Sequence, residues 1–295
     1  MTGMPCVLSS RLIEPRGVTM RKTGSRRAAK RAAPAPVLAL ALALGAAPAS
    51  ARTVTILAPE LPPMMTAEGK GHEAAIIGET LEACGHTASF RVVPFGRHWI
   101  DFRDGAQAGA AADAVTTVPT GMELPGARSV PYIRYQNGAS VLKRSRLSVA
   151  SLADLAGKRV VTFAGALDVL PGLREAVPGF ADFRERSDQL VHSNLLFAGR
   201  VDAVLADGLI FAEHNRLLLA KAEMGGTLPF DPRQEVVFAA IFPPTPYTMM
   251  FRDAALRDAF DRCFSDLEKK GRIDEINRAA VEPYRATVRN QYLRY

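Results

Sequence analysis

The stretch SLADLAGKRVVTF, residues 151–163, contains the local pattern on which the rest of the chain is built. Ser151 can cap a short helix over Ser151–Leu155, because its hydroxyl can accept a hydrogen bond from a free backbone N–H. The β-branched run Arg159–Phe163 predicts a strand, and Gly165 then leads into a helix-like segment from Leu167. The stretch therefore predicts a helix–strand–helix unit.

The same alternation extends in both directions. Further strands are predicted at 53–58, 89–93, 112–117, 138–143, 201–206, 236–241 and 247–251. Helices are predicted where apolar residues recur at helical spacing, at 73–84, 98–108, 188–198, 209–221, 253–270 and 273–280. Strands that alternate with helices form mostly parallel sheets, so we expect an α/β protein.

Residues 1–51 differ from the rest of the chain. Residues 20–31, MRKTGSRRAAKR, are strongly basic, and an apolar run over 36–47 is followed by the A-x-A pattern of residues 49–51. This order is typical of a secretory signal peptide cleaved after Ala51, and it predicts a periplasmic protein whose gene starts at Met1 or Met20. The run is shorter than the roughly 20 residues that span a bilayer, so no membrane insertion is expected after cleavage. The alternative is a buried Ala/Leu helix of the fold.

The basic charge of the chain belongs to this leader. The whole chain carries a net charge of +7, and residues 1–51 hold eight Lys and Arg against Glu14 alone. The remaining 244 residues are therefore neutral. A neutral mature chain lacks the basic footprint of a nucleic-acid-binding protein, so no nucleic acid partner is expected.

Two cysteines, Cys84 and Cys263, remain after the leader is removed. In an oxidising compartment they could form one disulfide, or they could be two buried thiols, and the sequence leaves both open. No C-x-x-C or H-E-x-x-H spacing occurs, so we predict no metal site and no cofactor.

Several motifs follow one another in a characteristic order. They are TVTILAPELPP at 53–63, DAVTT at 113–117, SVPY at 129–132, SLADLAGKRV at 151–160, and GRVDAV at 199–204 followed by Asp207. Together they resemble the type 2 periplasmic solute-binding proteins, in particular family 3, which includes the amino-acid receptors of ABC importers.

The resemblance implies a two-lobed α/β fold, with mostly parallel central sheets, helices on both faces and a two-strand hinge near Gly138 and Tyr247. Lobe 1 would comprise 52–137 plus 245–295, and lobe 2 would comprise 138–244. A small-molecule ligand would bind in the cleft between the lobes, at the carboxyl ends of the strands. The expected protein is a monomeric receptor that serves an inner-membrane ABC permease.

The ligand groups implied by the resemblance differ from those of an amino-acid receptor. The family's carboxylate-binding Arg falls at Met122, and the hydroxyl-bearing second clamp falls at Gly165 and Ala166, whereas its ammonium-binding acid is matched by Asp207. Asp207 could equally cap the following helix. The depleted anion clamp predicts a ligand other than a standard α-amino acid, either cationic or weakly polar.

Other candidates lie on segments expected to face this cleft. They are Glu60, Pro63, Met64, His72, Arg97, Thr116 and Thr117. Arg97 could replace the missing clamp or remain a surface residue, and Trp99 could line the cleft or belong to the core. Asp113 and Asp202 are expected to be structural.

Three classes of function remain open at this point. The first is a receptor, the second is a dehydratase-like enzyme on the same fold, and the third is a sensory or accessory binding module. No histidine lies in a recognisable catalytic motif and no G-x-S-x-G occurs, so the sequence predicts no catalytic residue and favours the receptor.

Overall fold

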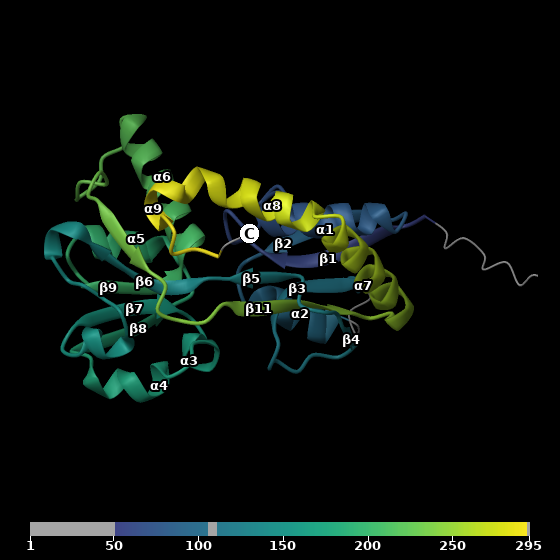
Figure 1. Ribbon diagram of the computed structural model, residues 1–295, viewed down its shortest axis with the longest axis horizontal. Coiled ribbons are helices and arrows are strands. Elements are labelled where there is room, and N and C mark those ends of the chain that lie inside the picture. Colours follow the sequence, from purple (N-terminus) through teal and green to yellow (C-terminus); the bar gives the residue numbers. More distant parts are fainter. Residues whose placement is uncertain (1–50, 106–110, 294–295) are drawn as a thin grey trace, which may run out of the picture. The chain divides into compact units, whose positions relative to one another are not determined.

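The computed structural model describes residues 51–105 and 111–293 (Figure 1). The predicted signal peptide lies almost entirely outside these residues. Within the described ranges, none of the helices has both the length and the apolar composition needed to cross a membrane.

The first sheet has the strand order β2–β1–β3–β11–β4, and β5 also pairs with β11. Its strands are β1 (Thr53–Pro59), β2 (Thr87–Val93), β3 (Ala114–Pro119), β4 (Ala127–Arg128), β5 (Ile133–Tyr135) and β11 (Thr245–Phe251). Strand β1 runs parallel to β2 and β3, whereas β11 is antiparallel to its three neighbours. The sequence missed the short strands β4 and β5.

Helices cover both faces of this sheet. Ile56 of β1 packs into a core with α1 (His72–Ala83), α7 (Ala254–Lys269) and α8 (Arg272–Val281). The next residue, Leu57, packs against Phe102 of α2 (Arg97–Gly105), because successive strand side chains point to opposite faces. We call this sheet with these four helices the first half.

The second sheet has the order β10–β6–β9–β7–β8. Its strands are β6 (Asn137–Leu142), β7 (Arg159–Phe163), β8 (Asp182–Arg186), β9 (Ala203–Asp207) and β10 (Val236–Ala239). Strand β7 is parallel to β8 and β9, whereas β6 is antiparallel to β9 and β10.

Helices cover both faces of the second sheet as well. One core contains Val160 and residues of α3 (Ala166–Val169) and α4 (Leu173–Ala176), and the other contains Val161 and residues of α5 (Leu190–Phe197) and α6 (Gly208–Glu223). This sheet with α3–α6 is the second half. Helix α5 begins at Leu190, two residues later than the predicted 188–198. The two sheets with helices on both faces confirm the predicted fold class.

The chain passes between the two sheets at two places. It leaves β5 and enters β6 through Gln136, and it leaves β10 and returns to β11 through residues 240–244. After α8, the residues of η4 (Glu282–Tyr284) and α9 (Arg285–Val288) contact α6, and α9 also contacts β10. The end of the chain therefore packs against the second half.

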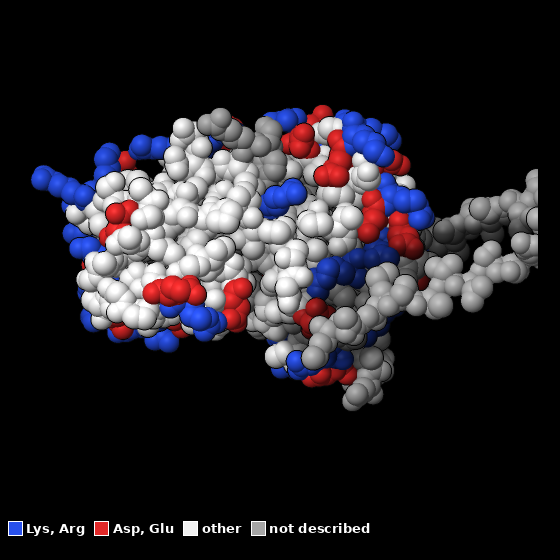
Figure 2. All heavy atoms as spheres, turned by 60° about the horizontal axis from the view of Figure 1, so that its bottom comes forward, with Lys and Arg blue, Asp and Glu red and all other residues white. Residues whose placement is uncertain are grey.

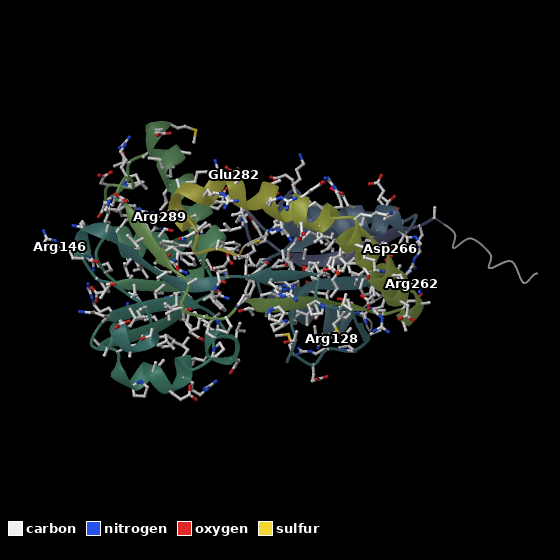
Figure 3. All side chains as sticks on the ribbon, in the orientation of Figure 1. Arg128, Arg146, Arg262, Asp266, Glu282 and Arg289 are labelled. Carbon is white, nitrogen blue, oxygen red and sulfur yellow. A yellow bond between two sulfur atoms is a disulfide. The ribbon has the colours of Figure 1, made fainter. Side chains whose placement is uncertain are left out.

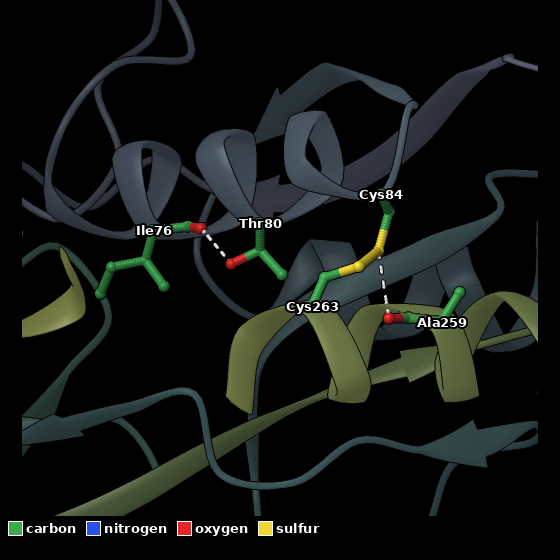
Figure 4. The surroundings of a disulfide bond; sticks show 5 residues. All are labelled: Ile76, Thr80, Cys84, Ala259 and Cys263. Atoms are coloured by element: carbon green, nitrogen blue, oxygen red, sulfur yellow. Dashed lines mark hydrogen bonds between the residues drawn. A yellow bond between two sulfur atoms is a disulfide. The ribbon is translucent and has the colours of Figure 1, made fainter. Parts of the chain in front are cut away.

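A disulfide joins Cys84, just after α1, to Cys263 of α7 (Figure 4). The first of the two alternatives left open for these cysteines is therefore confirmed. The bond fixes together two helices that cover the same face of the first sheet.

Candidate functional site

The main cavity, of about 590 Å³, lies where the carboxyl ends of β3 and β7 meet the crossover from β10 to β11. The first half contributes Phe95, Trp99 and Pro119–Met122, the second half contributes Phe163–Gly165, Asp168, Val169 and Pro171, and the crossover contributes Pro243–Tyr247. Carboxyl ends of strands are where open α/β sheets bind ligands. The volume of the cavity is in the range of known small-molecule binding sites.

The walls of this cavity are mainly aromatic and aliphatic. Phe95 and Trp99 pack edge to face with their ring centres 5.2 Å apart. Among the described lining residues, Asp168 is the one acidic side chain, and it also pairs with Arg174 at 2.6 Å. No Lys or Arg is found among the same residues. The cavity therefore suits an apolar body and offers no cation to a carboxylate.

Trp99 lines the cavity and also packs against the core around Phe102. Its Nε1 is buried and has no hydrogen-bond partner within the described part of the chain. Because this atom has almost no exposed surface, the ring and not its N–H is what the cavity offers to a ligand. The sequence left open whether Trp99 lines the cleft or belongs to the core.

Arg128 holds the loop that forms one wall. Its Nη1 donates to the carbonyl of Pro119 at 3.1 Å and to Oγ1 of Thr248 at 2.8 Å, and its Nη2 donates to the carbonyl of Met122. The guanidinium is thus occupied by the loop itself, and Met122 presents its side chain to the cavity.

A second cavity, of about 440 Å³, adjoins the first and shares Phe95 with it. Glu60 and Asp188 are its acidic lining residues, and again no Lys or Arg is among the described ones. His214 also lines it, and burial lowers the pKa of this imidazole, so the ring is neutral near pH 7.

The predicted site residues separate into those at the cavities and those elsewhere. Met122 and Gly165 line the first cavity and Glu60 lines the second, while Ala166 is buried at the start of α3. The Arg97 side chain is largely exposed, lines neither cavity, and donates from Nε to Asp101 at 2.5 Å.

Five other predicted residues belong to the first half and line neither cavity. They are Pro63, Met64, His72, Thr116 and Thr117. His72 is buried, its Nε2 lies 2.7 Å from Oδ1 of Asn277, and burial lowers its pKa to about 4. Pro63 and His72 border a groove between α1 and α8. Met64 belongs to the core.

Thr116 and Thr117 face a buried carboxylate that the sequence did not reveal. Their hydroxyls donate to Oε2 of Glu73 at 3.2 and 2.9 Å, and Tyr135 donates to Oε1 at 2.8 Å. Two consecutive threonines share one side because Thr117 has φ of 56° and the pairing with β11 shifts register here. Burial raises the pKa of Glu73. Its position in an amphipathic helix gave no signal that it would be buried.

Asp207 is 2 % exposed, and its carboxylate is used by the chain itself. Oδ1 accepts from the N–H groups of Leu209 and Ile210 at 2.8 and 3.1 Å, which is the helix cap named as the alternative. Oδ2 accepts from Gln136 N at 2.9 Å and from the Tyr292 hydroxyl at 2.7 Å. Burial raises its pKa to about 6, although these donors oppose the rise. Asp207 lines neither cavity.

The distribution of surface charge and the placement of possible metal ligands were compared with the cavities. Figure 2 shows Lys and Arg interspersed with Asp and Glu on the face in view, with a broad uncharged area in its middle. Within the described residues, no group of three His, Cys, Asp or Glu side chains is placed to hold a metal ion.

Comparison with known proteins connects this geometry to a fold family. No protein-family model and no curated protein sequence matches the chain. Solved structures do match. An ancestral arginine-binding protein bound to arginine is 20 % identical with a TM-score of 0.56, covering 79 % of this chain and 97 % of its own.

Two further structures are similar to the same extent. A probable amino-acid ABC transporter extracellular-binding protein of Bacillus subtilis is 18 % identical, with a TM-score of 0.58, over 78 % of this chain and 98 % of its own. An ancestral amino acid-binding protein, a precursor of cyclohexadienyl dehydratase, is 16 % identical, with a TM-score of 0.56, over 79 % and 95 %. At these identities the likeness shows the fold. The chain has the type 2 periplasmic-binding-protein fold, in agreement with the resemblance seen in its motifs.

Proposed function

We propose that residues 52–295 form a monomeric periplasmic receptor that binds a small solute between the two sheets and delivers it to an inner-membrane ABC permease. The observation that carries the proposal is the cavity at the carboxyl ends of β3 and β7, which has walls from both halves. A solute that contacts both halves favours the arrangement in which they are close, as in hinge closure.

The lining supports a ligand without a free carboxylate as its main anchor. The two cavities present Asp168, Glu60 and Asp188, and their described lining residues include no Lys or Arg. Phe95, Trp99 and Tyr247 offer aromatic surface, which attracts both apolar groups and organic cations. The proposed ligand is therefore a weakly polar or cationic molecule with an apolar body.

Matched ligand pairs test this proposal directly. Residues 52–295 would be screened by thermal shift against tyramine and tyrosine, phenethylamine and phenylalanine, and agmatine and arginine, within a broader small-molecule library. A ligand present at 100 times its Kd stabilises the fold by about 2.7 kcal/mol, which is readily seen. We expect stabilisation by decarboxylated members and none by their amino acids. Tight binding of a common L-amino acid would show that the ligand class is wrong.

Neighbouring residues of α2 provide a matched pair of variants for any ligand found. Trp99→Ala should weaken binding on the order of tenfold, because it removes aromatic surface that lines the cavity. Arg97→Ala, two residues away, should leave affinity unchanged, because Arg97 pairs with Asp101 outside the cavities. The reverse result would move the site away from this cavity.

An enzyme is the second candidate, because one structural neighbour is named as a dehydratase precursor. Asp168 is the one acidic group at the main cavity among the described residues, and no His lies among them to form an acid–base pair with it. We therefore propose binding without turnover. Mass spectrometry of library ligands after incubation with the protein should return them unchanged, and a dehydrated or hydrolysed product would establish the enzyme instead.

A further inference from the structure

The end of the chain forms a third connection between the two halves. We define the C-terminal segment as residues 282–293, which follow α8 (Figure 1). Helix α8 packs on α1 and α7 of the first half, whereas the C-terminal segment contacts α6 and β10 of the second half. Figure 3 labels Glu282 and Arg289, which mark its course. The other two connections are Gln136 and residues 240–244.

Two tyrosine hydroxyls fix the C-terminal segment to buried carboxylates of the second half. Tyr284 donates to Oε2 of Glu213 at 2.9 Å, and Tyr292 donates to Oδ2 of Asp207 at 2.7 Å. Both carboxylates are nearly inaccessible to water, and Tyr292 is itself buried. Each carboxylate has other donors as well, Arg216 for Glu213 and backbone N–H groups for Asp207, so each keeps its position when a hydroxyl is removed. Hydrogen bonds to charged acceptors are stronger than those between neutral groups, so each hydroxyl holds the segment to a fixed anchor.

Asp207 is also joined to one of the crossovers. The oxygen that accepts from Tyr292 accepts from Gln136 N as well, and the other oxygen caps α6. One carboxylate therefore holds together a crossover residue, the start of α6 and the C-terminal segment. A rotation of one half about the two crossovers has to carry this segment along or break its two hydroxyl contacts.

We propose that the C-terminal segment is a strap that restrains the second half against the first and so limits how far the ligand cavity opens. Tyr284 and Tyr292 are its fastening points, and Glu213 and Asp207 are their anchors. This role needs no particular ligand, and it holds for any solute that binds in the cavity.

The strap is tested on the ligand-free protein, so its failure is distinct from a failure of the proposed function. Spin labels at Glu175→Cys on α4 and Glu268→Cys on α7, both exposed, report the distance between the halves by pulsed electron resonance. We expect one narrow distance distribution in the parent. In Tyr284→Phe combined with Tyr292→Phe, the distribution should broaden and its mean should move to a longer distance.

Hydrogen exchange provides a second readout in the same protein. Amides of residues 285–292 should exchange about tenfold faster for each hydroxyl removed, because each contact to a buried carboxylate holds the segment closed. Arg285→Ala is the matched control, since Arg285 pairs with Glu282 within the exposed part of the same segment. It should change neither readout.

The double Tyr→Phe variant keeps both rings, so it is expected to fold, and circular dichroism would verify this. An unchanged distance distribution in the folded double variant would overturn the strap. Faster exchange with an unchanged distribution would also overturn it, because the segment would then detach without releasing the second half.

Discussion

The two halves of the molecule use different means to hold their buried carboxylates and helices. In the first half, Glu73 is satisfied by side-chain hydroxyls of its own sheet, and a disulfide links α1 to α7. In the second half, Asp207 is satisfied by backbone N–H groups and by a tyrosine from the end of the chain. The described cysteines form no cross-link in the second half.

This difference indicates that the carboxylate network of the first half is self-contained, whereas that of the second half draws on contacts from outside it. Glu73, Thr116, Thr117 and Tyr135 all belong to elements of the first half. Asp207 draws on Gln136 of a crossover and on Tyr292. If the comparison is right, substitutions in the first half should lower the stability of that half alone. Substitutions around Asp207 should also weaken the contacts that join the two halves.

Removal of the disulfide should have the largest effect. The two cysteines are 179 residues apart, and the conformational entropy that so long a cross-linked loop removes from the unfolded chain is worth about 5 kcal/mol. Cys84→Ser with Cys263→Ser should lower the free energy of unfolding by about this amount in urea titrations. Hydrogen exchange should accelerate in α1 and α7 more than in β6–β9. An equal acceleration in both halves would contradict a self-contained first half.

Glu73→Ala should have the next largest effect and lower the free energy of unfolding by about 3 kcal/mol. The change leaves the hydroxyls of Thr116, Thr117 and Tyr135 without their shared acceptor in a buried cavity. Glu82→Ala is the control on the same helix, because Glu82 is exposed, and its effect should be within about 0.5 kcal/mol. Chemical denaturation of both variants measures the difference. Similar stability of the two would mean that the buried network contributes nothing.

The contrast between these residues also shows what the sequence could predict. The main elements followed from periodicity, since the predicted strands 159–163 and 89–93 coincide with β7 and most of β2, and the predicted helix 253–270 matches α7 to within one residue at each end. Short elements such as β4 and β5 were missed because two or three residues carry no period. Strand β8 was missed because DFRER is charged at four of its five positions and has one apolar residue.

The site was predictable only where a motif fixes a position relative to a strand end. Met122, Gly165 and Glu60 follow strand ends and do line the cavities. Thr116 and Thr117 were placed at a strand end, but β3 continues to Pro119, so the residues after it reach the cavity instead. Phe95 and Tyr247 line the same cavity only because of tertiary packing, and no local spacing in the sequence predicts that they meet.

The titration of Asp207 gives a pH-dependent test of the second half. Its folded pKa is about 6 and its ordinary value is 3.8, because burial disfavours the charged form. The folded protein therefore binds this proton more tightly than the unfolded chain. The contribution of Asp207 to stability falls as pH rises from about 4 to 6, by at most about 3 kcal/mol.

Asp207→Asn removes this titration and keeps a residue able to cap α6. Urea titrations at pH 7, 5.5 and 4 should show the wild type gaining on Asp207→Asn as the pH falls. Asp202→Asn is a control, because Arg159 lowers the pKa of Asp202 from its ordinary value of 3.8, so wild type should keep a nearly constant advantage over that variant from pH 7 to 4 and lose it only in stronger acid. Parallel pH profiles for wild type and Asp207→Asn would refute the raised pKa.

The smallest effects are expected at two surface ion pairs, one in each half, in which an Arg makes a two-pronged contact with a carboxylate. Arg272 of α8 meets Glu79 of α1 at 2.6 and 2.8 Å, and Arg159 of β7 meets Asp202 at 2.7 and 3.1 Å. Arg272 also donates from Nη1 to Glu275 of its own helix at 2.8 Å. All four side chains are between about a third and a half exposed, so solvent screens both pairs.

Arg272→Lys and Arg159→Lys keep the charge and lose the two-pronged contact. Each should cost about 0.5 kcal/mol in low salt and less in high salt, to an equal extent in the two halves. Since both pairs are exposed two-pronged contacts, unequal losses here would mean that the halves differ at their surfaces as well, and the contrast could no longer be assigned to the disulfide and the buried carboxylates.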